Sequence, residues 1–98
     1  MSVKELAIQR LTQQIAPVLK AQGIVRAGLF GSVARGEAKR GSDVDILIET
    51  DGTLGLFEFV GLKQALESRL KRHVDLVEYS TIKPALRKKI MLDHIQLV

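Results

Sequence analysis

The chain of 98 residues contains no cysteine at all. Without thiols it can form no disulfide bond, no thiolate metal site and no cysteine nucleophile. It also lacks any apolar run near the roughly 18 residues that span a bilayer, and its start, with Lys4 and Glu5, does not follow the pattern of a signal peptide. These absences predict a cytoplasmic protein with no membrane partner.

Aromatic residues are scarce, and the complete set is Phe30, Phe57, Phe59 and Tyr79. The net charge of +4 and the pI near 9.7 would suit a nucleic-acid-binding protein. However, a platform for stacking bases needs exposed rings, and three of these four lie among apolar neighbours, so direct nucleic-acid binding is not expected. The basic groups at 69–72 and 87–89 are predicted to be solvated helix faces and helix ends, or a docking surface for an acidic partner.

The length predicts a single domain, residues 1–98, with one hydrophobic core. Apolar spacing predicts helices over 2–22, 54–71 and 80–94, a short helix over 32–38, and strands over 24–30, 43–49 and 73–78. This order of elements predicts an α/β fold, a small mixed β-sheet with helices packed on it.

Finer expectations attach to the helices. Ser2 and Glu5 form a capping-box pattern, and Pro17 should kink the first helix or begin a second short one. Gly61 predicts close packing of the helix over 54–71. The residues expected to face inward there are Leu56, Phe59, Val60, Leu62, Leu66 and Leu70. Those expected to form the apolar stripe of the last helix are Leu86, Ile90, Met91 and Ile95.

The stretch from 29 to 49 is predicted to carry the chemistry. Its second half, Ser42-Asp43-Val44-Asp45, opens an apolar strand, and alternation along that strand puts Asp43 and Asp45 on one side, roughly 6 to 7 Å apart. Two carboxylates so close repel each other unless a cation lies between them, and Mg²⁺ takes oxygen ligands of this kind. The pair therefore predicts a metal site.

The first half of the stretch offers groups that suit a phosphate. Gly31 allows close backbone approach, Ser32 brings a hydroxyl at the start of a short helix, and Arg35 adds a permanent charge. Gly31 and Gly36 have the spacing of a P-loop, but Glu37 follows where that motif requires Lys, so a P-loop is rejected. Asp-x-Asp and Gly-Ser are each common in ordinary turns, and only their combination within about twenty residues points to a site.

A third carboxylate, Asp75, lies within the apolar strand over 73–78. An acid there is costly unless something positive meets it, so it is either a ligand, a salt-bridge partner or an edge residue. His73, next to a basic helix end, is interpreted as structural or solvated, and His94 has no partner at metal-ligand spacing.

The segments Gly31-Ser32-Val33-Ala34-Arg35-Gly36-Glu37 and Ser42-Asp43-Val44-Asp45-Ile46-Leu47-Ile48 together resemble the signature of the nucleotidyltransferase superfamily that includes DNA polymerase beta. The Ala-Arg-Gly-Glu segment and the length are similar to those of its minimal nucleotidyltransferases. The resemblance implies the polymerase beta palm-like fold.

The same resemblance implies the roles of the site residues. Two Mg²⁺ ions would be bound by Asp43, Asp45 and Asp75, which matches the superfamily's third acidic residue. Gly31 and Ser32 would hold the terminal phosphates of ATP. Arg35 and Ser42 would help, although Arg35 could equally brace the loop by pairing with Glu37 or Glu49.

The resemblance further implies transfer of AMP from ATP to a hydroxyl, with release of pyrophosphate. The implied acceptor is a tyrosine of a partner HEPN toxin, against which the chain would act as antitoxin in a hetero-oligomer. Two alternatives stay open: a non-catalytic module that neutralises its partner by binding, and a stand-alone transferase acting on RNA ends or a small molecule.

Overall fold

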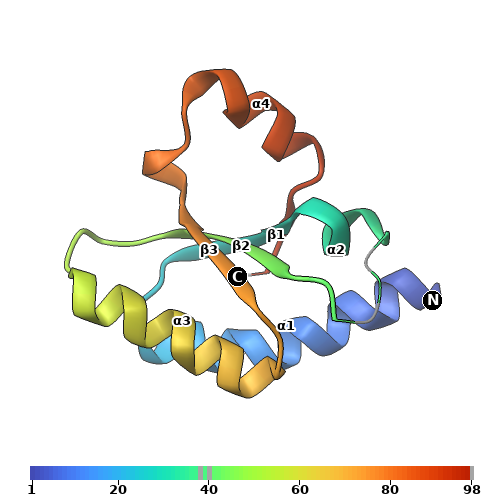
Figure 1. The fold of residues 1–98 in the computed structure, drawn as a ribbon, viewed down its shortest axis with the longest axis horizontal. Helices are drawn as coiled ribbons and strands as arrows, with labels where there is room; N and C mark the ends of the chain where they lie inside the picture. Colours follow the sequence, from blue (N-terminus) through green and yellow to red (C-terminus); the bar gives the residue numbers. More distant parts are fainter. Residues whose placement is uncertain (38, 40, 98) are drawn as a thin grey trace.

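The computed structural model describes residues 1–37, 39 and 41–97 (Figure 1). Its elements in chain order are α1 (Val3–Ala21), β1 (Arg26–Phe30), α2 (Gly31–Arg35), β2 (Val44–Glu49), α3 (Leu56–Leu70), β3 (Val74–Glu78), the 3₁₀ turn η1 (Tyr79–Thr81), α4 (Pro84–Leu92) and β4 (Ile95–Gln96). The predicted short helix is α2, and Ala38, where it was expected to end, lies outside the described residues. No helix in the described part of the chain is both long and apolar enough to cross a membrane.

The strands form one mixed sheet in the order β3-β2-β1-β4. Strand β1 pairs antiparallel with β2 and β4, whereas β2 and β3 are parallel. The connection between the two parallel strands is α3, as a parallel pair requires a crossover. The predicted α/β class with a small mixed sheet is confirmed.

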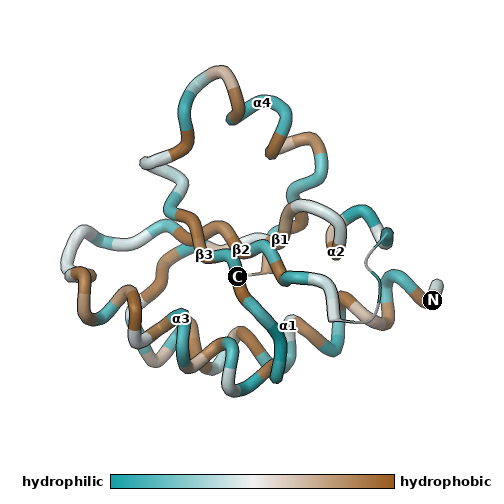
Figure 2. The backbone as a smooth tube through the Cα atoms, in the orientation of Figure 1, coloured by the Kyte–Doolittle hydropathy of each residue, from teal (hydrophilic) through white to brown (hydrophobic). Residues whose placement is uncertain are grey.

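One face of the sheet carries the core, and α1 and α3 lie across it (Figure 1). In β2 this face is made by Val44, Ile46 and Ile48, all fully buried. The helices contribute buried residues spaced four apart: Leu11, Ile15 and Leu19 from α1, and Leu62, Leu66 and Leu70 from α3. In Figure 2 the strands are brown over much of their length, whereas the helices alternate between brown and teal. The opposite face carries the polar residues Asp45 and Asp75 together with apolar ones, among which Leu47 is also fully buried.

Helix α1 begins with the predicted capping box, in which the Glu5 amide donates to the Ser2 hydroxyl at 3.1 Å and the Ser2 amide donates to the Glu5 carboxylate at 3.4 Å. The expected second helix at Pro17 is wrong, because α1 continues through it to Ala21. Pro17 is exposed and removes only one backbone hydrogen bond, and the packed stripe of α1 holds the helix together on both sides of it.

Two expectations for α3 are wrong. Leu56 and Val60 are 76% and 43% exposed, and a Cβ on Gly61 would meet no atom within 4 Å. The buried stripe is narrow because it follows every fourth residue, and at about 100° per residue Val60 lies roughly 120° around the helix from the centre of that stripe. The predicted inward face of this helix was too wide because it included every apolar residue near the stripe.

The C-terminal segment differs most from its prediction. The expected helix over 80–94 is divided into η1 and α4, and α4 has no buried residue. Ile95, assigned to the helical stripe, instead begins β4, which pairs with Gly28 and Leu29, while Leu97 is buried in the core. The edge of β1 would otherwise expose unpaired backbone groups, which explains why these last residues are extended. In Figure 1, η1 and α4 form an arch beyond the sheet.

Candidate active site

The candidate site lies on the sheet face opposite α1 and α3, where strand alternation places Asp45. The register pairs Asp45 with Asp75 across the parallel β2–β3 pair and with Phe30 across the antiparallel β1–β2 pair. Phe30 leads directly into Gly31 and α2. Three chain segments therefore bring two carboxylates and the Gly-Ser turn to one end of the sheet.

Gly31 lies directly against the Asp45 carboxylate. A Cβ built on Gly31 would come within 2.1 Å of Asp45 Oδ2, and the backbone there has φ +72°, in the left-handed region. Both facts require glycine, because an L side chain would strain the backbone and displace the carboxylate. Ser32, at the second position of α2, is half-buried beside this contact.

The carboxylates influence one another. Burial is the largest cause that raises the pKa of Asp45, followed by the negative charges of Asp75 and then Asp43, while Arg35 lowers it. Asp43 and Asp75 are exposed. The charged form of Asp45 is therefore disfavoured until a cation offsets its neighbours.

The donors suit Mg²⁺, since they are hard carboxylate oxygens from two adjacent strands and the turn before them. Within the described ranges, however, no three His, Cys, Asp or Glu side chains are already arranged as a metal-binding group. Asp43 and Asp75 would have to turn toward an ion, which their exposure permits. The ligand roles of Asp43, Asp45 and Asp75 stay predictions.

Arg35 is held by two carboxylates. Its Nε donates to Glu37 Oε2 and its Nη1 to Asp93 Oδ2, both at 3.0 Å, and these bonds raise its pKa. The alternative of bracing through Glu37 is confirmed, whereas Glu49 instead lies 3.8 Å from Arg26 Nε. Because Asp93 follows α4, Arg35 ties α2 to the arch.

Ser42 shapes the loop before Asp43. Its hydroxyl accepts from the Lys39 amide at 2.8 Å, and its carbonyl accepts from Nε and Nη2 of Arg72 at 3.0 and 2.7 Å. A direct role for Ser42 in phosphate binding stays a prediction. The sequence did not predict that Arg72 binds the Ser42 carbonyl. A Lys-Arg pair at a helix end carries no signal for a backbone partner 30 residues away.

Residues 12–98 match the family described as the nucleotidyltransferase domain. The chain belongs to this family. Among curated relatives, the protein adenylyltransferase MntA of Thermococcus cleftensis is 42% identical over 73 residues, 74% of each chain. MJ0435 of Methanocaldococcus jannaschii, provisionally named a protein adenylyltransferase, is 37% identical over 91 residues, 93% of this chain and 98% of the relative. The chain is thus a nucleotidyltransferase by family and by relatives.

Solved structures agree with this assignment. A toxin–antitoxin complex with AMP-PNP has a chain that matches with a TM-score of 0.78 and 29% identity, covering 89% of this chain and 72% of that one. The complex of a tri-AMPylated Shewanella oneidensis HEPN toxin with its MNT antitoxin matches with a TM-score of 0.73 and 26% identity, covering 92% and 71%. The predicted nucleotidyltransferase fold is confirmed.

A second polar group of this nucleotidyltransferase lies farther along the same sheet face. The hydroxyl of Tyr79 is hydrogen-bonded to Nε2 of His94, and the Arg26 guanidinium lies 4.4 Å from the centre of the Tyr79 ring. Burial, and then the positive charge of Arg26, lower the pKa of His94. The pairing of His94 with Tyr79 was not predicted. Gly28 is the sequence feature that could have indicated this contact, because a glycine within a strand can mark the close approach of another group.

The substitution Gly28→Ala tests this contact. A Cβ on Gly28 would lie 2.0 Å from His94 Nε2, so the imidazole must leave Tyr79 or the strand must shift. We expect a loss of about 1 to 3 kcal/mol in the free energy of unfolding, measured by urea titration. In a chain that already carries His94→Ala, adding Gly28→Ala should cost much less of the free energy of unfolding, because the clashing imidazole is gone. Equal losses in both backgrounds would contradict the proposed cause.

Proposed function

We propose that this nucleotidyltransferase moves AMP from ATP to a tyrosine hydroxyl of a HEPN-domain partner and thereby acts as its antitoxin. The observation that carries the proposal is the placement of Asp45, opposite Asp75 and against Gly31. Relatives named protein adenylyltransferases and the AMPylated HEPN toxin bound to an MNT antitoxin support the acceptor and the partner. We also propose that the protein acts in the cytoplasm.

The roles of the residues follow from their positions. Two Mg²⁺ ions held by Asp43, Asp45 and Asp75 would supply charge neutralisation and would lower the pKa of the acceptor hydroxyl. The backbone of Gly31 and the hydroxyl of Ser32 hold the terminal phosphates. Arg35 and Ser42 keep the flanking segments in place and contribute to phosphate binding from there.

The reaction is a displacement at the α-phosphorus of ATP. The acceptor oxygen forms a bond to that phosphorus, and the bond between the phosphorus and the oxygen that bridges to the β-phosphorus breaks. Pyrophosphate leaves with the electron pair, and the hydroxyl proton passes to water or to the exposed Asp75 carboxylate. The chain's contribution is positioning and charge compensation.

The test is intact-mass spectrometry of the proposed HEPN partner after incubation with the chain, ATP and Mg²⁺. Added mass in whole AMP units is expected, and fragmentation should locate it on a tyrosine. The variant Asp43→Ala/Asp45→Ala should add none. A partner left unmodified by the unaltered chain would overturn the proposed transfer.

Neutralisation by binding alone is the second candidate. It is favoured by the absence, in the described residues, of a preformed group of three metal-binding side chains, and by the two carboxylates that already occupy Arg35. The readout is RNA cleavage by the HEPN protein mixed with Asp43→Ala/Asp45→Ala. Full neutralisation by this variant would favour binding, whereas loss of neutralisation would favour AMP transfer.

A further inference from the structure

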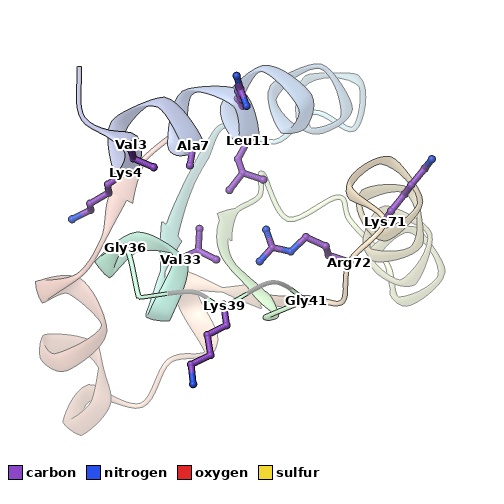
Figure 3. A pocket seen from close by; sticks show the side chains of 11 residues that line it. Val3, Lys4, Ala7, Leu11, Val33, Gly36, Lys39, Gly41, Lys71 and Arg72 are labelled. Carbon is purple, nitrogen blue, oxygen red and sulfur yellow. The ribbon is translucent and has the colours of Figure 1, made fainter.

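A cavity of about 780 Å³ lies beside the candidate active site but is lined by none of its carboxylates. It is open on one side and is bounded by the first half of α1, by α2, by Gly36, Lys39 and Gly41 before β2, and by the turn after α3 (Figure 3). Its centre is apolar, formed by Val3, Ala7, Leu11 and Val33. Its size is in the range of sites that take up part of a ligand or a partner.

The charged residues around this cavity are all basic. Among the described residues that line it there is no Asp or Glu, and the basic ones are Lys4, Arg10, Lys39, Lys71 and Arg72. No ion pair within the described ranges involves any of them. The positive charge around the cavity is therefore uncompensated.

Figure 3 shows how these groups are directed. The guanidinium of Arg72 points to the centre, near Leu11 and Val33, where it also holds the Ser42 carbonyl. The side chains of Lys4 and Lys39 extend outward from the rim. Arg72 points inward but donates to the Ser42 carbonyl, and Lys4 and Lys39 point outward, so the basic groups do not converge as a small anion would need. Apolar lining residues with basic groups at the rim instead fit a larger surface that is apolar in the middle and acidic around it.

We propose that this cavity is the docking site for the partner protein, which inserts one or two apolar side chains flanked by Asp or Glu. This inference rests on the proposed function, because the partner is the protein that carries the acceptor hydroxyl. Nucleic acid is a poorer fit, since the described residues that line the cavity include no aromatic ring for base stacking.

Docking at this cavity would place the partner near the reacting groups. Gly41 lines the cavity, and Asp43 follows it by two residues, so their Cα atoms are within roughly 7 Å of each other. Arg72 lines the cavity and fixes the carbonyl of Ser42, the residue before Asp43. A partner segment seated against Gly41 and Arg72 therefore lies close to Asp43.

The experiment compares two charge reversals of equal size. Lys4→Glu/Arg10→Glu changes the cavity rim, and Lys88→Glu/Lys89→Glu changes exposed residues of α4 outside it. Lys4 stands in the first turn of α1, where an acidic residue favours the helix, so the fold should be retained. Binding of each variant to the proposed HEPN partner is measured by calorimetry at low and high salt.

We expect the rim variant to raise Kd by about 10- to 100-fold at low salt, with a smaller effect at high salt, and the α4 variant to change it less than about 3-fold. At saturating partner the rim variant should still transfer AMP, because its carboxylates are intact. Equal weakening by both variants, or none by the rim variant, would overturn the docking site. If the unaltered chain binds through the rim but adds no AMP, the docking site stands and the proposed transfer fails.

Discussion

Replacing Asp45 with Asn is expected to abolish transfer and, without metal, to stabilise the chain. Transfer should fall by about 10³-fold or more, since this carboxylate lies between Gly31 and Asp75 where charge on the phosphates must be offset. Stability should rise, because Asp45 is partly desolvated and repelled by two other carboxylates. The two effects separate a functional carboxylate from one that serves the fold.

The stabilisation should depend on pH in a defined direction. The pKa of Asp45 is raised from its ordinary 3.8, so the folded chain holds this proton more tightly than the unfolded chain does. The free energy of unfolding therefore falls as pH rises from 3.8 through the raised pKa, and the loss persists at neutral pH. Asp45→Asn escapes this loss, so its Tm in EDTA should exceed that of the unaltered chain by about 2 to 5 °C at pH 7 and match it near pH 3.

Asp51→Asn is the matched control. Hydrogen bonds from Thr53 lower the pKa of Asp51, so its ionised form favours folding and its replacement should give no rise in Tm. Adding Mg²⁺ should raise the Tm of the unaltered chain and of Asp51→Asn, but not that of Asp45→Asn. An equal response of all three to Mg²⁺ would count against an ion at Asp45.

Local chemistry explains why much of the site could be anticipated. The period of two along a strand predicts that Asp43 and Asp45 lie on one side without reference to the rest of the fold, although β2 begins only at Val44 and Asp43 precedes it. Asp75 needed more, because its position opposite Asp45 depends on the β2–β3 register, which no spacing within the chain determines. The resemblance to the superfamily supplied that alignment.

Contacts between distant residues account for what was missed. Arg35 and Asp93 are 58 positions apart, and Tyr79 meets His94 only because η1 and α4 arch back to the sheet. Strand β4 has two residues, too few for a period of two to be distinguished from a helical one. The extended conformation of a short edge strand such as β4 thus depends more on pairing with its neighbour than on its own sequence.

Gly31→Ala should cause the second large effect. The added Cβ would lie 2.1 Å from Oδ2 and 3.0 Å from Cγ of Asp45, and the backbone at φ +72° disfavours alanine by about 1 to 2 kcal/mol. The Asp45 carboxylate must then turn away from its position beside Asp75. We expect transfer to fall by about 10²- to 10³-fold, measured as kcat/KM for ATP, together with a lower free energy of unfolding.

Gly52→Ala separates the two causes of that loss. Gly52 has a similar backbone angle, φ +87°, but a Cβ there meets no atom within 4 Å, so only the backbone cost applies. This variant should lose similar backbone stability and keep its transfer rate. If Gly31→Ala kept a rate within about 3-fold of Gly52→Ala, the contact between Gly31 and Asp45 would matter only to the fold. A loss specific to Gly31→Ala would instead mean that transfer requires the Asp45 carboxylate in the position that this glycine allows.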